Sequence, residues 1–154
     1  MEPHQEQHPH TQKDHAKNRK TIYTNHLVYR RNEHWFHLSE QQRQHAAEEL
    51  QAVLDKYRDR ITIRGIYSTV GFRNDSDVVF WLLSEEVDAL QDFAVDVRGT
   101  AFGQGTCLQW AFPGLTRPPE FVGDHITSFQ KGIPPCKYLC LYPFVRTPEW
   151  YLLP

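Results

Sequence analysis

Residues 78–97 of this 154-residue chain read VVFWLLSEEVDALQDFAVDV, and this stretch decides the fold. Its first part, residues 78–83, is a short apolar run, which predicts a strand covered on both faces. Ser84 is placed to cap a helix, with acidic residues in its first turn that favour the helix dipole. Gly103 and Gly105 predict the end of that helix. Its buried stripe is predicted from apolar residues at helical spacing: Val87, Leu90, Ala94, Val97 and Ala101.

A strand and a helix are predicted upstream in the same order. Residues 22–31 are rich in β-branched and aromatic side chains and predict the first strand. Residues 39–42 read SEQQ, a capping box, and apolar residues at helical spacing continue behind it until about Arg58. Alternation over residues 61–69 then predicts a second strand, and the polar cluster at 74–77 supplies a turn.

A fourth strand follows the second helix. Residues 106–112 place Leu108, Trp110 and Phe112 on one face. The order β-α-β-β-α-β predicts an α+β, ferredoxin-like domain with an antiparallel sheet. Its helices cover one face, so we expect the other, apolar face to be buried by a second domain or another subunit.

The remaining residues divide the chain into parts. Residues 1–20 contain almost no large apolar side chain and are expected to be a disordered, histidine-rich tail before the domain at 21–115. Proline and glycine mark 116–135 as a linker. Residues 136–154 are interpreted as the start of a second domain that the chain does not complete, with a fifth strand over 137–146.

Composition narrows the function classes. A formal net charge of -2 offers no basic face for nucleic acid. No apolar run approaches the roughly 20 residues of a membrane span, and the polar N-terminus does not resemble a secretory signal, so a cytoplasmic protein is expected. Cys107, Cys136 and Cys140 are interpreted as reduced cysteines in strands, because no second pair exists to complete a zinc site.

Several motifs together resemble the coproheme decarboxylases of the chlorite dismutase family, and the similarity runs from about residue 21 to the end of the chain. Among these enzymes, the chain most resembles the actinobacterial type. Any one motif alone is weak, but the combination is specific. The motifs are YPFVR (142–146), EWYLLP (149–154), GIYSTVGFR (65–73) followed by Asp75-Ser76-Asp77 and Trp81, LTRP (115–118) and HITSF (125–129).

The resemblance implies an architecture and a reaction. Family members have two ferredoxin-like repeats per subunit, form pentamers, and bind haem in the second repeat through a proximal histidine on a later helix. We therefore expect this chain to be the N-terminal portion of such a haem-biosynthesis enzyme, with no iron ligand of its own. The reaction converts two propionates of iron coproporphyrin III into vinyl groups, giving haem b, with hydrogen peroxide as oxidant.

The same resemblance assigns roles to four residues. His125 matches a distal histidine and suits a general base near neutral pH. Tyr142 matches a tyrosine that carries an oxidising equivalent to the propionate. Arg146 matches a cationic position, which other branches of the family fill with lysine, and a guanidinium pairs well with carboxylates. Trp150 matches an aromatic residue near the propionates.

Each of these residues also has an interpretation without catalysis. His125 fits a solvated linker histidine, and Tyr142 a strand tyrosine that packs its ring and hydrogen-bonds its hydroxyl. Arg146 fits a surface arginine and Trp150 a packed core residue. The alternative functions are a non-catalytic porphyrin-binding module, a haem-free ferredoxin-like oligomer, and a haem peroxidase or chlorite-degrading relative. No Gly-x-Ser-x-Gly or glycine-rich phosphate loop indicates a hydrolase or a nucleotide enzyme.

Overall fold

A computed structural model describes residues 20–116 and 126–152 of the chain. Residues 1–19 of the predicted tail and the candidate base His125 lie outside these ranges. The elements, in order, are β1 (Tyr23–Arg31), α1 (Glu33–His37), α2 (Glu40–Lys56), β2 (Thr62–Ser68), β3 (Val78–Ser84), α3 (Val87–Gly99), α4 (Ala101–Gln104), β4 (Thr106–Leu115) and the 3-10 helix η1 (Pro148–Leu152).

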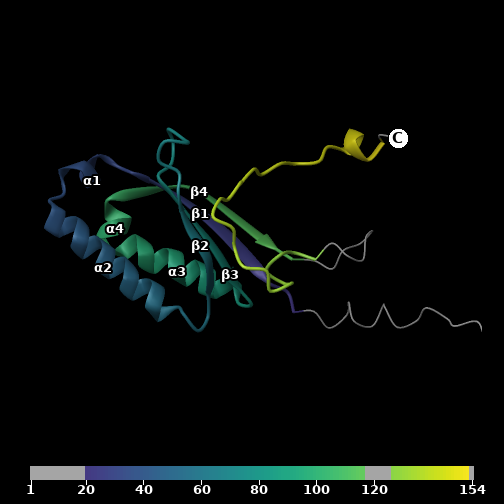
Figure 1. Ribbon diagram of the computed structural model, residues 1–154, viewed down its shortest axis with the longest axis horizontal. Helices are drawn as coiled ribbons and strands as arrows, with labels where there is room; N and C mark the ends of the chain where they lie inside the picture. Colours follow the sequence, from purple (N-terminus) through teal and green to yellow (C-terminus); the bar gives the residue numbers. More distant parts are fainter. Residues whose placement is uncertain (1–19, 117–125, 153–154) are drawn as a thin grey trace, which may run out of the picture.

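The four strands form one antiparallel sheet in the order β2-β3-β1-β4, with the helices on one of its faces (Figure 1). The helical connections β1–β2 (through α1 and α2) and β3–β4 (through α3 and α4) each join strands that lie two places apart in the sheet. This arrangement confirms the predicted α+β, ferredoxin-like fold. It leaves β2 and β4 as the edge strands.

The hydrophobic core lies between the helices and the sheet. Phe80 of β3 and Phe93 of α3 are almost completely buried, and the ring of Tyr57 meets Phe93 edge to face at 5.7 Å between centroids. β3 is covered on both faces, as predicted, because Val79 and Leu83 on its other side are also buried. The complete core cluster is Leu27, Tyr29, Tyr57, Ile61, Phe80, Leu82, Ala89, Leu90, Phe93 and Val97.

Helix α2 begins where the capping box predicts. The Ser39 hydroxyl accepts a hydrogen bond from the Gln42 amide at 3.3 Å, and the Gln42 side chain accepts one from the Ser39 amide at 2.8 Å. Two backbone donors that the helix leaves free are thereby satisfied.

The start predicted for α3 is wrong. Ser84 is the last residue of β3, and its hydroxyl donates to the Arg60 carbonyl at 2.7 Å and accepts from the Glu86 amide. The Ser84 hydroxyl therefore bonds at the end of the strand and does not cap the helix. The helix starts at Val87, and its N-cap residue, Glu86, makes no side-chain capping bond. The buried stripe is Ala89, Leu90, Phe93 and Val97, whereas Val87 is 51% exposed. The helix also ends earlier, at Gly99, before the separate α4.

The predicted fifth strand is not formed. Residues 137–146 pair with no strand in the part of the chain that the structure describes. Pro134, Pro135 and Pro143 lack the backbone N–H that a ladder requires, which disfavours pairing along this segment. Cys136 and Cys140 consequently lie outside any strand, as exposed free thiols.

Candidate functional site

The face of the sheet opposite the helices carries an aromatic surface. His26 of β1 stacks on Trp81 of β3, with ring centroids 5.5 Å apart, and pairs in register with Phe112 of β4. Burial lowers the pKa of His26 despite an opposing hydrogen bond to the backbone of Phe112. Trp110 is two residues from Phe112 and remains 37% exposed. The apolar open face predicted from the sequence is therefore present.

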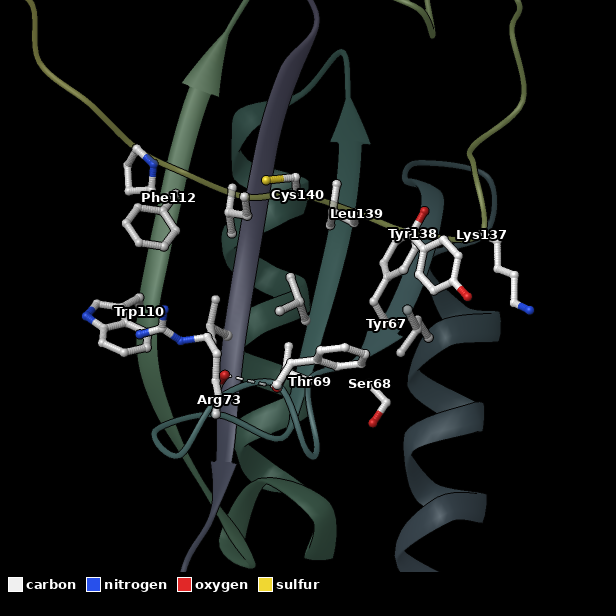
Figure 2. Close-up of a pocket in the computed structure, with 17 residues that line it drawn as sticks. Tyr67, Ser68, Thr69, Arg73, Trp110, Phe112, Lys137, Tyr138, Leu139 and Cys140 are labelled. Carbon is white, nitrogen blue, oxygen red and sulfur yellow. Dashed lines mark hydrogen bonds between the residues drawn. The ribbon is translucent and has the colours of Figure 1, made fainter.

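The segment 137–143 crosses this face, and together with the sheet it lines an open cavity of about 810 Å³ (Figure 2). The figure shows the chain passing in front of the strands from Lys137 to Cys140, with the helices behind the sheet. Apolar side chains from the sheet and from the crossing segment form most of the lining, among them Val28, Val79, Phe72, Phe112, Leu139 and Leu141.

One of the cationic side chains that line the cavity, Arg73, is already paired with a carboxylate. Arg73 donates to both carboxylate oxygens of Asp75, with Nε 2.7 Å from Oδ1, and its guanidinium lies 5.6 Å from the centre of the Trp110 ring. The hydrogen bond from Arg73 lowers the pKa of Asp75. Arg73 therefore contributes to the cavity lining with its charge balanced by Asp75.

Three of the candidate catalytic and substrate-binding residues gather beyond the cavity. Tyr142 stacks on Phe144, with centroids 6.1 Å apart and planes 15° apart. The guanidinium carbon of Arg146 lies 6.0 Å from the Phe144 ring centre and 4.3 Å from that of Trp150. All of these rings are at least half exposed, so we call residues 142, 144, 146 and 150 the aromatic–arginine cluster.

The donor set of this cluster fits a carboxylate-bearing porphyrin. Arg146 makes no ion pair within residues 20–116 and 126–152, so its N–H groups are free to bind a carboxylate. The exposed rings of Tyr142, Phe144 and Trp150 add aromatic surface that suits a flat, conjugated ring. Across the described ranges, no group of three or more His, Cys, Asp or Glu is placed to hold a metal ion.

The site differs from the sequence expectation in two respects. Tyr142, Phe144 and Arg146 are connected by ring and cation contacts, but they project from an irregular segment and not from a strand. The cavity residues of β2, including Tyr67, were not predicted as functional. Their alternation was visible in the sequence, but no sequence signal indicates that residues 137–143 fold back across the sheet.

Within the described ranges, no helix is both long and apolar enough to cross a membrane.

Comparison with known proteins agrees with these features. The family model for chlorite dismutase matches residues 43–154. A coproheme decarboxylase from Mycolicibacterium smegmatis is 43% identical over 95 residues, which cover 61% of this chain and 41% of that protein. A chlorite dismutase from Ideonella dechloratans is 25% identical over 127 residues, covering 77% of this chain and 44% of that protein. The chain thus spans less than half the length of these curated relatives.

Solved structures show the same fold at low identity. A mutant of chlorite dismutase from Candidatus Nitrospira defluvii superposes with a TM-score of 0.62 at 17% identity, covering 77% of this chain and 50% of that chain. A haem-binding protein from Thermus thermophilus superposes with a TM-score of 0.53 at 22% identity, covering 62% of this chain and 41% of that chain. The family match covers most of the residues described above, and the chain belongs to the chlorite dismutase family.

Proposed function

We propose that this chain forms part of a coproheme decarboxylase, a haem-biosynthesis enzyme that converts iron coproporphyrin III to haem b with hydrogen peroxide. The observation that carries the proposal is the aromatic–arginine cluster, in which the Arg146 guanidinium lies over Trp150, close to the Tyr142–Phe144 pair, and makes no ion pair with any described residue. The coproheme decarboxylase of M. smegmatis, 43% identical over the matched residues, supports the choice of substrate.

The proposed substrate explains why the cluster combines a cation with aromatic rings. Coproporphyrin carries four propionates on a flat ring, so binding requires cationic partners as well as aromatic surface. Arg146 would hold one carboxylate through paired hydrogen bonds, for which its planar guanidinium is suited. The Trp150 indole N–H would donate to a neighbouring carboxylate oxygen.

The reaction balances with peroxide as the only oxidant. Each propionate carboxylate, with one H₂O₂ and one proton, gives a vinyl group, one CO₂ and two waters. When iron coproporphyrin III is bound, its iron would provide the redox chemistry by which peroxide removes two electrons per propionate. The carbon–carbon bond to the carboxylate and one C–H bond at the β-carbon break, and the vinyl double bond forms.

Two residues of this chain would move the protons and hydrogen atoms. His125 would accept a proton from peroxide, as a general base near neutral pH. Tyr142 would lose an electron and its hydroxyl proton, and its oxygen would then take the hydrogen atom from the β-carbon. The Tyr142 ring is exposed and stacks on Phe144. Its hydroxyl makes no side-chain hydrogen bond with the described residues, so it would be available to a substrate.

The architecture of the whole enzyme is part of the same proposal. Residues 21–115 would form the first ferredoxin-like repeat, 116–135 the linker, and 136–154 the start of a second, haem-binding repeat that supplies the proximal histidine. The assembled protein would be a cytoplasmic homopentamer.

A binding titration tests the proposal directly. The purified chain is titrated with iron coproporphyrin III, and the Soret band is followed; iron mesoporphyrin, which carries two propionates in place of four, is the control ligand. We expect a saturable Soret shift with coproporphyrin and weaker binding of mesoporphyrin. Equal binding of the two porphyrins, or no shift with either, contradicts the assignment of the cluster to propionate recognition.

A further inference from the structure

The edge strand β2 holds the chain segment that leads to Tyr142. The Tyr67 hydroxyl donates to the Cys136 carbonyl at 3.1 Å, and the Arg64 guanidinium donates to the Ile133 carbonyl at 2.8 Å. Both bonds join residues that are 69 positions apart in the chain. Their geometry depends on the folded sheet and not on local sequence.

Gly65 makes room for the Tyr67 ring. A Cβ built on Gly65 would lie 2.5 Å from Cε2 of Tyr67 and 2.8 Å from its hydroxyl oxygen, far inside contact distance. The ring therefore lies directly over the glycine, and this position brings the hydroxyl to Cys136. Any larger residue at 65 forces the ring away.

Arg64 contributes a second point of attachment. Its guanidinium lies 5.2 Å from the centre of the Trp81 ring, and Trp81 meets Phe129, in the turn before Ile133, edge to face at 6.4 Å. A register shift between Ile63 and Gly65 in the β2–β3 pairing occurs at the position of Arg64. Such irregularities re-aim side chains at the edge of a sheet.

Side chains make these attachments because the segment cannot pair with β2 as a strand. Pro134 and Pro135 lie between the two anchored carbonyls and have no N–H to donate to a ladder. Their carbonyls and those beside them still need donors. A phenol and a guanidinium on the edge strand supply two of them.

We propose that Arg64, Gly65 and Tyr67 form a clamp that fixes the path of residues 129–136 and thereby positions Tyr142. Gly65 and Tyr67 belong to the motif GIYSTVGFR, which the decarboxylation chemistry leaves without a role. Tyr142 is six residues beyond Cys136, so the clamp confines it to within about 20 Å of that anchor. The clamp is a set of positioning residues, and its catalytic consequence rests on the proposed function.

Hydrogen exchange tests the clamp without any porphyrin. The amides of Lys131, Gly132 and Ile133 bond to Thr127, Phe129 and Ser128 in a local turn, so their exchange reports whether the turn stays in place. Tyr67→Phe removes one hydrogen bond, and we expect exchange of these amides to accelerate roughly fivefold, while amides of β1 and β3 are unchanged. Tyr23→Phe is the control, since its hydroxyl has no hydrogen-bond partner in the described residues.

Gly65→Ala tests the position of the Tyr67 ring separately from the presence of the Tyr67 hydroxyl. It keeps the Tyr67 phenol but displaces the ring, so we expect the same acceleration at residues 131–133. A thermal unfolding midpoint close to that of the parent shows that the sheet remains folded. Unchanged exchange in both Tyr67→Phe and Gly65→Ala overturns the clamp.

Turnover of iron coproporphyrin III with peroxide by the complete enzyme, which includes the proposed second repeat, tests the catalytic consequence. If the clamp positions Tyr142, Tyr67→Phe lowers kcat severalfold and changes the KM for porphyrin little. A kcat equal to that of the parent, in a variant with faster exchange, overturns the positioning role while leaving the proposed function intact. A complete parent enzyme without turnover counts against the proposed function, and the exchange result still decides whether the clamp exists.

Discussion

The guanidinium carbon of Arg146 lies 4.3 Å from the centre of the Trp150 ring, across the start of the 3-10 helix η1. The Trp150 amide donates to the Thr147 carbonyl at 3.0 Å, which holds the ring in this position. A cation–π contact attracts the guanidinium to the ring without consuming a hydrogen-bond acceptor, so its N–H groups can still bind a carboxylate. The contact therefore orients a cation that has no carboxylate partner among the described residues.

Arg146→Gln is expected to weaken binding of iron coproporphyrin III about tenfold, because a charge-assisted hydrogen bond to a propionate is lost. Arg146→Lys should retain most of the affinity, since the charge remains. The Soret titration measures both. Arg98→Gln, which removes an exposed arginine from α3, is the matched control. Equal losses in the Arg146 and Arg98 variants would show that net charge alone matters.

Phe93→Ala should destabilise the domain by about 3–5 kcal/mol, because it leaves a cavity in the core. Phe93 has no exposed surface and packs against Tyr57 and Phe80. Urea unfolding followed by circular dichroism measures the loss. Val95 lies on the same helix but is 63% exposed. Val95→Ala should therefore change the free energy of unfolding by less than about 0.5 kcal/mol.

Ser39→Ala is expected to cost about 1 kcal/mol of stability, because the hydroxyl that caps the Gln42 amide is lost. Ser39→Asp should keep the cap and restore the stability. The midpoint of urea unfolding distinguishes the two substitutions. An alanine variant as stable as the parent contradicts the capping role.

Asp77→Asn should reduce the loss in free energy of unfolding that the protein shows as the pH falls into the acidic range. Burial raises the pKa of Asp77, but hydrogen bonds from the Arg31 side chain and amide outweigh it, and the net pKa is lowered. The ionised carboxylate therefore stabilises the fold fully above the unfolded pKa of about 3.9, and this contribution disappears as the pH falls through the folded pKa.

Unfolding in urea at pH 7 and pH 2.5 checks this sign. The parent should lose more stability between the two pH values than Asp77→Asn. Asp59→Asn is the control, since Asp59 is exposed and makes no ion pair within the described ranges. If Asp77→Asn and the parent respond equally to acid, the Arg31 pair does not stabilise the fold.

The parts of the fold that local sequence dictates were predictable. The capping box at Ser39 and the apolar spacing behind it specified α2, and the run at 78–83 specified a strand buried on both faces. The order of elements then led to the ferredoxin-like sheet. In each case neighbouring residues carry the signal, so no distant contact is needed to interpret it.

The remaining features depend on contacts between distant residues. Ser84 has a side chain suited to an N-cap, but its hydroxyl donates a hydrogen bond to the Arg60 carbonyl, 24 positions away. Residues 137–146 have the composition of a strand, yet they pair with no described strand, and residues 137–143 cross the open face. Tyr142, Arg146 and Trp150 came from a family resemblance, and sequence alone could not show that Arg146 stacks on Trp150.

The most direct test of the account is decarboxylation of iron coproporphyrin III by the complete enzyme, in which the proposed second repeat supplies the iron ligand. Hydrogen peroxide is added, and the porphyrin products are measured by mass in the parent and in Tyr142→Phe. The account predicts successive losses that correspond to two propionates becoming vinyl groups in the parent, and binding without these losses in Tyr142→Phe. Decarboxylation that proceeds equally in Tyr142→Phe, or that is absent from the porphyrin-bound parent, would contradict it.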